Sequence, residues 1–285
     1  MDYKTISYEK DEDGVVLITL NRPQKLNSMS IVMFWEILKA LKEIEADEEA
    51  KAVVLTGAGR AFSSGADLWA AEPLELSKEE QAEFDAMGAE FRAKLGGIND
   101  MGGFFSVFWA LENKIFDFEK PMIAAINGLA FGVGLCLAQC CDLVYASENA
   151  TMSYLFIRNA IGTTDMGTTY LIPRSLGIYK AKELMMLGDT ISAREAERLG
   201  LVNGVFPPDE LMPEVRKVAR RFAKGPTMAL KQMKRVINSQ HKDGLSRAFE
   251  LEIKAAVAST SSLECMEALM RRGQKQEPFP EFTGG

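Results

Sequence analysis

The sequence predicts an α/β core followed by a helical C-terminal section. Short runs of apolar and β-branched residues alternate with helical stretches up to about residue 160, and such alternation is typical of α/β folds. Two of these runs pass directly into loops rich in glycine, at residues 57–65 and 128–134. From Gly167 onward the pattern is mostly helical. We therefore expect a core at 1–207, with a helical or lid-like insertion at about 70–119, and a helical region at 208–285.

Each predicted strand is a short apolar run bounded by turn residues. These runs are Val15–Leu20, Ala52–Thr56, Pro121–Ile126, Leu143–Tyr145 and Thr151–Ile157. The predicted helices carry apolar residues at helical spacing, and Gly200, Gly225 and Gly244 mark boundaries between them. They are Ile31–Ile44, Leu135–Cys141, Glu195–Leu201, Leu211–Ala223, Met228–Asn238, Leu245–Val257 and Ser262–Arg272.

Composition and charge exclude several classes of function. The chain has 285 residues, of which 47% are hydrophobic and 26% charged, as in ordinary globular proteins. Its formal net charge of -7 argues against a surface for nucleic acid. No apolar run approaches the roughly 18 residues of a membrane span, and the charged N-terminus lacks the apolar segment of a signal peptide. We expect a cytoplasmic protein with neither a nucleic-acid nor a membrane partner.

The cysteines and the histidine also narrow the chemistry. The four cysteines (Cys136, Cys140, Cys141 and Cys265) fit a reducing compartment, and three of them share one apolar helix without a nearby histidine. Core packing is therefore favoured over a metal site. His241, the single histidine, lies in a polar stretch. A Ser-His-Asp or Cys-His mechanism is disfavoured for that reason.

The stretch Lys120–Ser147 has the strongest functional pattern. A buried strand is followed by Asn127-Gly128, and Gly132 and Gly134 then flank Val133 at the start of a helix. The first N–H groups of such a helix have no partner within it, so they suit an anion or a carbonyl that becomes one. A tight turn that needs glycine only for packing is the alternative. A second strand with a glycine loop, at 52–65, could supply another donor to the same site.

Five segments carry a resemblance to a known family. They are LNRPQKLNSMS at 20–30, VVLTGAGRAFSSGADL at 53–68, KPMIAAINGLAFGVG at 120–134, ISAREAERLGLVNGVFP at 191–207 and the final helices. In this order they identify the chain as a member of the crotonase superfamily, also called the enoyl-CoA hydratase/isomerase family. The resemblance implies a crotonase-like spiral of ββα units with a C-terminal helical trimerisation region. It also implies an acyl-CoA thioester substrate, a homo-oligomer (a trimer or a dimer of trimers), no metal, and no cofactor beyond the CoA of the substrate.

The resemblance also assigns residues to the thioester. The backbone N–H groups of Ala66 and Val133 would form the oxyanion hole that holds the thioester oxygen. The segments that match the CoA-binding part of the family are Lys25–Leu26 and Ser64 to Leu68, which gives Lys25, Leu26, Ser64, Ala66, Asp67 and Leu68. Lys25 could reach a phosphate, and a solvated surface lysine is the alternative.

The chain departs from the hydratase pattern at the catalytic positions. Hydratases that resemble it use two glutamates, one to activate water and one to deliver a proton. The first position is Cys136 here, and the second falls at Phe156 or Ile157. Neither carboxylate is present, which counts against ordinary hydration and against a glutamate-based isomerase.

Asp165 is the carboxylate that remains. Its position resembles the nucleophilic aspartate of 4-chlorobenzoyl-CoA dehalogenase and an aspartate of dienoyl-CoA isomerase and of dihydroxynaphthoyl-CoA synthase. In an apolar pocket its pKa would rise, which suits an acid or a base near neutral pH. The alternative is that Asp165 only caps the helix that begins at Gly167.

The expected function is acyl-CoA processing with Asp165 as the acid/base. Proton transfer (double-bond isomerisation or atypical hydration) is the main expectation, and hydrolysis, dehalogenation or C–C bond chemistry is the alternative. A catalytically silent CoA-thioester binder is a hypothesis of another class, suggested by the missing glutamates. Nearby methionines and aromatic residues (Phe104, Phe105, Phe108, Trp109 and Phe156) suggest an apolar acyl pocket for a cyclic or aromatic group, although lid packing also explains them. The residues expected in that pocket are Cys136, Tyr154, Phe156, Ile157 and Trp109.

Overall fold

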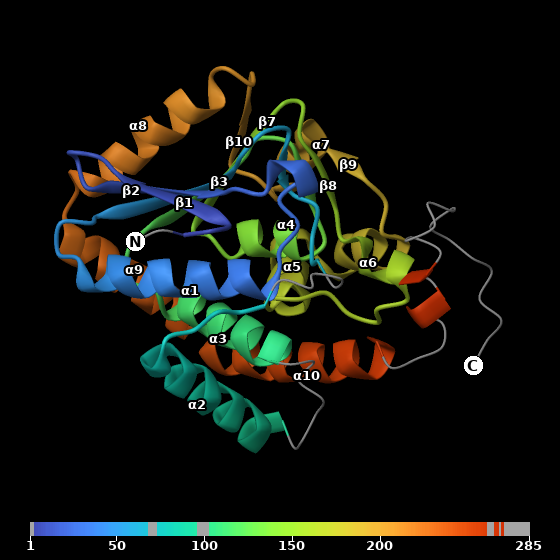
Figure 1. Ribbon diagram of the computed structural model, residues 1–285. Coiled ribbons are helices and arrows are strands. Elements are labelled where there is room, and N and C mark those ends of the chain that lie inside the picture. Colours follow the sequence, from blue (N-terminus) through green and yellow to red (C-terminus); the bar gives the residue numbers. More distant parts are fainter. Residues whose placement is uncertain (1–2, 68–72, 96–102, 261–264, 268, 271–285) are drawn as a thin grey trace.

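The computed structural model describes residues 3–67, 73–95, 103–260, 265–267, 269 and 270. A six-stranded sheet forms the centre of the molecule, and most of the helices lie on one side of it (Figure 1). Its strands are parallel except for the antiparallel pair β1 and β2. In spatial order they are β1 (Ile6–Lys10), β2 (Val15–Leu20), β3 (Ala52–Gly57), β5 (Met122–Ile126), β7 (Leu143–Ser147) and β10 (Gly204–Phe206).

A second, four-stranded sheet stands at the carboxyl ends of the central strands. It contains β4 (Ala61–Ser63), β6 (Leu129–Phe131), β8 (Thr151–Ser153) and β9 (Ile191–Ser192), in that order. The strands β3, β5 and β7 of the first sheet are each followed directly in the chain by a strand of the second. This repeated strand–strand unit is the spiral that the family resemblance implies, and it confirms the predicted α/β core.

The predicted strand Thr151–Ile157 is wrong beyond Ser153. Its partner β6 ends at Phe131, and the following Gly132 N–H donates to the Ser153 carbonyl at 3.0 Å, so the pairing stops there. Leu155–Asn159 instead forms the 3-10 helix η3. The short strands β1, β4, β6, β9 and β10 have no counterpart in the prediction, because two to five residues hold too little alternation to detect.

Ten α-helices are present in the described part of the chain, with a 3-10 helix, η1 (Pro23–Lys25), in the predicted polar turn. The helices are α1 (Ile31–Ala46), α2 (Lys78–Leu95), α3 (Phe104–Asp117), α4 (Val133–Gln139), α5 (Thr168–Leu176), α6 (Ile178–Leu187), α7 (Ala193–Leu199), α8 (Leu211–Ala223), α9 (Thr227–Ser239) and α10 (Lys242–Thr260). Of the last predicted helix, Ser262–Arg272, the described residues 265–267, 269 and 270 are helical and the others lie outside the described residues.

The predicted insertion at 70–119 contains α2 and α3, and α3 is part of the core. Figure 1 shows α3 between α1 and α10, with α2 on the outside. Val107 and Leu111 of α3 are fully buried in the main core cluster. On its other side, Trp109 packs with Phe91 of α2 and Phe249 of α10. The position of α10 matters for the site, because it brings the C-terminal part of the chain against α3 and α5.

Helix α8 covers the opposite face of the central sheet. Its Leu211, Val215 and Ala219 are buried against sheet residues such as Val54 and Ile123. The sheet is thus covered on both faces, which explains why β3 and β5 are continuous apolar runs. The division at residue 207 between core and helical region stays a prediction. Among the described helices, none combines the length and the apolar character of a membrane span.

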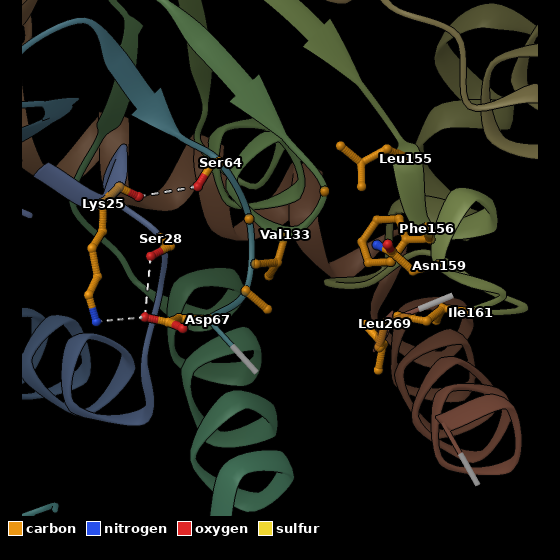
Figure 2. Close-up of a pocket in the computed structure, with 13 residues that line it drawn as sticks. Lys25, Ser28, Ser64, Asp67, Val133, Leu155, Phe156, Asn159, Ile161 and Leu269 are labelled. Atoms are coloured by element: carbon orange, nitrogen blue, oxygen red, sulfur yellow. Dashed lines mark hydrogen bonds and ion pairs between the residues drawn. The ribbon is translucent and has the colours of Figure 1, made fainter. Parts of the chain in front are cut away.

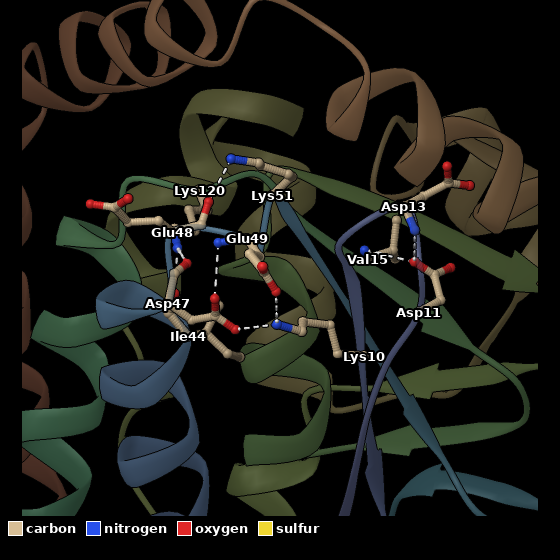
Figure 3. A network of polar contacts seen from close by, with 10 residues as sticks. All are labelled: Lys10, Asp11, Asp13, Val15, Ile44, Asp47, Glu48, Glu49, Lys51 and Lys120. Carbon is tan, nitrogen blue, oxygen red and sulfur yellow. Dashed lines mark hydrogen bonds and ion pairs between the residues drawn. The ribbon is translucent and has the colours of Figure 1, made fainter.

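A polar network fastens the end of the sheet where β2, β3 and β5 begin (Figure 3). Lys10 donates to the Asp47 carboxylate at 2.7 Å and to that of Glu49 at 3.1 Å. Lys120 donates to the Asp47 carbonyl at 2.6 Å. The Asp11 carboxylate closes the turn between β1 and β2 by accepting from the Val15 N–H at 2.9 Å. With this end held, the opposite, carboxyl ends of the parallel strands present their loops to one another, as ligand-binding loops do in α/β folds.

Candidate active site

Two glycine loops meet at the carboxyl ends of β3 and β5. Gly65 follows β4, and Gly132 follows β6, each with a positive φ, +101° and +54°. A Cβ atom on Gly65 would lie 3.1 Å from the Phe131 carbonyl oxygen and 3.8 Å from the Gly132 Cα. The backbones of the loops therefore approach closely, and glycine serves both the conformation and the contact. This contact brings Ala66 and Val133 to one place.

The Ala66 N–H points away from the chain that pairs with it. Met29 and Ala66 form an isolated parallel bridge, in which the Met29 N–H donates to the Gly65 carbonyl at 2.8 Å. The Asp67 N–H donates to the Met29 carbonyl at 2.9 Å. In a parallel bridge these two bonds use only the groups that flank the central residue, so the Ala66 N–H is directed to the other side.

The Val133 N–H is at the start of a helix. Val133 is the first residue of α4, and Gly132, the N-cap, has no side chain to satisfy the first N–H groups. A Cβ atom on Gly134 would lie 2.5 Å from the Ser63 Cβ, so glycine is required for α4 to begin this close to β4. The helix dipole adds partial positive charge at the same point.

A cleft of about 320 Å³ opens beside these two residues (Figure 2). Lys25, Ser28, Ser64 and Asp67 lie along one side of it, and Leu155, Phe156, Asn159, Ile161 and Leu269 along the other, with Val133 between them. Of the predicted CoA-binding residues, Lys25, Ser64, Ala66 and Asp67 line this cleft. Leu26 supports it from behind, since its carbonyl accepts from the Ser64 N–H at 2.9 Å. Leu68 lies outside the described residues.

Sequence reasoning missed two residues that hold this side of the cleft. Arg22, which is only 3% exposed, pairs with the Asp67 carboxylate at 2.9 Å. Buried Asn27 has a positive φ, and its side chain donates to the carbonyls of Ala58 and Ala61 at 2.9 and 2.8 Å. Asp67 is therefore a structural anchor for the loop as well as a lining residue. The only signal for Arg22 and Asn27 in the sequence was their position in the segment NRPQKLN.

A narrower apolar pocket of about 50 Å³ adjoins the cleft. Ala66, Val133, Phe156 and Ile161 line both, so the predicted oxyanion donors stand where the two spaces meet. The rest of its wall comes from phenylalanines of α1 and α3 and from the end of α10: Phe34, Phe104, Phe105, Phe108, Ala256 and Thr260. Asp165 completes the wall, as the one ionisable side chain among the described residues that line it.

Of the residues predicted for the acyl pocket, Phe104, Phe105, Phe108 and Phe156 line this pocket. Trp109 faces away, into the cluster with Phe91, where the ring centroids are 6.4 Å apart. Ile157 turns toward Gly188, whose added Cβ would lie 3.0 Å from the Ile157 Cγ2. A one-residue step along η3 separates Phe156 from Ile157, and the two side chains leave the helix in different directions.

Cys136 and Tyr154 are buried behind the pocket. The Cys136 Sγ lies 3.5 Å from the Thr168 Oγ1, and burial raises the pKa of this thiol well above its usual value. Burial also raises the pKa of the Tyr154 hydroxyl. A thiol that stays protonated is a poor nucleophile, so Cys136 is not favoured in that role.

Asp165 does not cap α5. The N-cap of that helix is Gly167, and no side chain of the cap residue takes part. The Asp165 side chain instead faces the apolar pocket, partly buried. Burial and, after it, the charge of Glu252 raise the pKa of Asp165 to about 8. A carboxyl group with this pKa is suited to accept or deliver a proton near neutral pH.

Two buried glutamates next to Asp165 were missed by sequence reasoning. Glu112 of α3 accepts from the Met166 N–H at 2.8 Å, and Glu252 of α10 accepts from the Gly167 N–H at 2.7 Å. Both lie within the buried side of their helix, Glu112 beside Leu111 and Ile115, and Glu252 beside Ile253. A carboxylate within an apolar helical stripe was the signal that could have found them.

Comparison with known proteins identifies the family. The family model described as enoyl-CoA hydratase/isomerase matches residues 10–95 and 81–280, which is most of the chain. The chain belongs to the enoyl-CoA hydratase/isomerase family. It is therefore an enzyme of the hydratase and isomerase class, and the predicted crotonase fold is confirmed.

Several relatives of the enoyl-CoA hydratase/isomerase family match over nearly their whole length. A crotonyl-CoA hydratase of Syntrophomonas wolfei is 34% identical, with 95% of this chain and 97% of that protein covered. A 1,2-epoxyphenylacetyl-CoA isomerase of Escherichia coli is 31% identical, with 96% of each covered. Among solved structures, an enoyl-CoA hydratase of Mycobacterium avium subsp. paratuberculosis has a TM-score of 0.82 at 28% identity, with 99% and 100% covered.

Proposed function

We propose that this enzyme binds an acyl-CoA thioester and catalyses proton transfer on its acyl group, with Asp165 as the acid/base. One observation carries the proposal: Asp165 lines the same apolar pocket as Ala66 and Val133. A thioester whose carbonyl oxygen accepts from these two N–H groups would place its acyl chain in that pocket, and its CoA portion would extend along the adjoining cleft.

The proton-transfer step needs only groups of this chain. The Asp165 carboxylate takes a proton from a carbon next to the thioester carbonyl or conjugated with it. The electron pair moves to the carbonyl oxygen, where the Ala66 and Val133 N–H groups stabilise the negative charge. Return of the proton to another carbon shifts the double bond. In hydration, Asp165 would instead take a proton from water as the water oxygen adds to the β-carbon of an enoyl thioester, and the same proton would then go to the α-carbon of the resulting enolate. Neither route requires a cofactor beyond the CoA of the substrate.

The walls of the pocket favour an apolar acyl group, with a cyclic or aromatic one as the preferred class. Phe34 meets Phe104 and Phe108 edge to face, with ring centroids 5.5 and 5.3 Å apart. Ring edges and faces of this kind pack well on another ring. The isomerase relative of Escherichia coli is named for a phenylacetyl thioester, which agrees with this preference.

Mass spectrometry of CoA thioesters incubated with the enzyme in heavy water tests the proposed reaction. The panel includes straight-chain enoyl, dienoyl, alicyclic, aryl and halogenated aryl thioesters. Deuterium uptake or added water supports enolate chemistry and identifies the acyl class. Release of free CoA or exchange of halide for hydroxyl would instead indicate hydrolysis or dehalogenation by Asp165. Binding of every thioester without change would indicate a silent binder.

Lys25 is proposed to contact a phosphate of CoA. It lies at the side of the cleft with 47% of its side chain exposed, and its Nζ is 3.6 Å from the Asp67 carboxylate. We expect Lys25→Ala to raise KM for the thioester roughly two- to fivefold, the size of an exposed ion pair, and to change kcat little. The difference should shrink at high salt. An unchanged KM at low salt would contradict the contact.

We also propose that the chain forms a trimer or a dimer of trimers, in the cytoplasm. Two helices expose apolar side chains that a subunit interface would cover. On α9 they are Met228, Met233, Val236 and Ile237, and on α6 they are Tyr179, Met186 and Leu187. Light scattering after gel filtration should give three or six times the 31.5 kDa of one chain. A Met233→Glu, Ile237→Glu variant should dissociate, and a monomeric wild type at micromolar concentration would contradict the proposal.

A further inference from the structure

The backbone around Asp165 is held in a strained turn. Met166 has a φ of +57°, which is unfavourable for a residue with a side chain, and Gly167 follows with a φ of +68°. A left-handed residue of this type costs roughly 1–2 kcal/mol, so neighbouring groups must maintain it. The conformation turns the Asp165 side chain into the pocket rather than along the start of α5.

Three groups maintain this turn. Glu112 accepts from the Met166 N–H at 2.8 Å, and the Cys140 Sγ donates to the Met166 carbonyl at 3.2 Å. Glu252 provides most of the contacts: its carboxylate accepts from the Gly167 N–H at 2.7 Å, from the Thr169 N–H at 2.9 Å and from the Thr169 hydroxyl. Glu252 thus satisfies N–H groups at the start of α5 that Gly167 has no side chain to satisfy.

We propose that Glu252 is a positioning residue that holds the turn after Asp165, and so keeps the Asp165 side chain in the acyl pocket and next to a buried negative charge. It rests on the proposed function, because that function gives Asp165 the acid/base role. Glu252 itself lines neither the cleft nor the acyl pocket, so it acts only through the turn and through its charge.

The groups that face Asp165 come from three elements. They are Glu252 on α10, Glu112 on α3 and Cys136 on α4. Burial, joined by the charges of Glu252 and Asp165, raises the pKa of Glu112 well above its usual value, which favours its neutral form. The pKa of the Cys136 thiol is also raised well above its usual value, with burial as the largest cause. Beyond burial, Glu252 is therefore the neighbouring group whose negative charge raises the pKa of Asp165.

The hydrogen bonds to Glu252 favour its charged form. Burial raises the pKa of Glu252 to about 7, and the Thr169 hydroxyl and two N–H groups oppose that rise. Asp165 has a pKa of about 8, so on lowering the pH it takes up the first proton of the pair. Because the two carboxyls interact, the values belong to the pair as much as to either group.

The test is a carbon-13 NMR titration of the Asp165 carboxyl carbon in the full-length protein, with Asp165→Asn to assign the signal. In Glu252→Gln the charge is lost, while the amide oxygen can still accept a hydrogen bond from the turn. We expect the titration midpoint of Asp165 to move down by about one pH unit. If Asp165 acts as a base, the rising limb of the kcat profile should move down with it, and kcat should change more than KM.

Glu112→Gln is the matched control. It replaces a carboxyl whose neutral form burial favours, and the glutamine can still accept from the Met166 N–H, so the Asp165 midpoint should stay in place whatever the effect on rate. An unchanged midpoint in folded Glu252→Gln, or an equal shift in Glu112→Gln, would overturn the proposal. Because the midpoint does not depend on turnover, it decides this question even if Asp165→Asn proves fully active and the proposed function fails.

Discussion

Val133→Pro should lower kcat by roughly 10²–10³-fold, the cost of one oxyanion-hole donor. A side-chain truncation cannot remove a backbone N–H, whereas proline can. The position tolerates proline, because Val133 is the first residue of α4, where the N–H has no partner within the helix and the fixed φ of proline fits. Steady-state kinetics with the thioester identified in the heavy-water panel measures the loss.

Val133→Ala is the control for this experiment. It keeps the N–H and removes most of the side chain, so it reports the packing contribution of Val133 in the wall of the pocket. We expect it to retain most of the activity. Because Val133 is buried in the main core cluster, both variants should unfold at a lower temperature than the wild type, and the lowering should be similar in the two. Full activity of a folded Val133→Pro enzyme would show that this N–H is not an oxyanion donor.

Asp165→Asn should lower kcat by roughly 10²–10⁴-fold, the usual contribution of a general acid or base. Asparagine keeps the size and polarity of the side chain but cannot take or give the proton. Binding of the CoA thioester should change little, because Asp165 lines the acyl pocket and not the cleft. Isothermal calorimetry with an unreactive thioester separates the two effects. An enzyme with unchanged kcat would exclude Asp165 as the acid/base.

A measurement of stability checks that Asp165→Asn is folded. The pKa of Asp165 determines the direction in which the stability should change. The folded-state pKa of Asp165, about 8, lies above the value of roughly 3.9 for an unfolded aspartate. Between these values the folded state binds the extra proton, so this group makes the protein less stable as the pH rises toward 8. Asparagine removes that penalty. We expect the unfolding temperature of Asp165→Asn to equal or exceed that of the wild type at pH 9.

Local backbone features of the site could be predicted from the sequence. Gly65 and Gly132 are needed where the two loops touch, and the glycines appear in the sequence directly before Ala66 and Val133. A strand, a glycine and a helix start are properties of a few consecutive residues, so their consequence, free N–H donors at the carboxyl ends of the strands, is also local. The α/β class and the helices α8 and α9 were predictable for the same reason.

The sequence alone could not show which side chains surround Asp165 in the acyl pocket. Trp109 and Phe108 are neighbours in α3, yet Phe108 lines the acyl pocket and Trp109 faces the cluster with Phe91. Both are aromatic and both are buried, so no pattern of polarity distinguishes them. Which of them meets the ligand depends on how α3 is rotated between α1 and α10.

The sequence by itself determined the α/β fold, the two glycine loops, and Asp165 as the carboxylate that remains near them. Only the tertiary structure decided that Asp165 faces the pocket, instead of capping α5, and that Glu112 and Glu252 hold its turn. The physical reason is the distance along the chain. Glu252 and Gly167 are 85 positions apart in the sequence, and only the packing of α10 against α3 and α5 brings the Glu252 carboxylate to the Gly167 N–H.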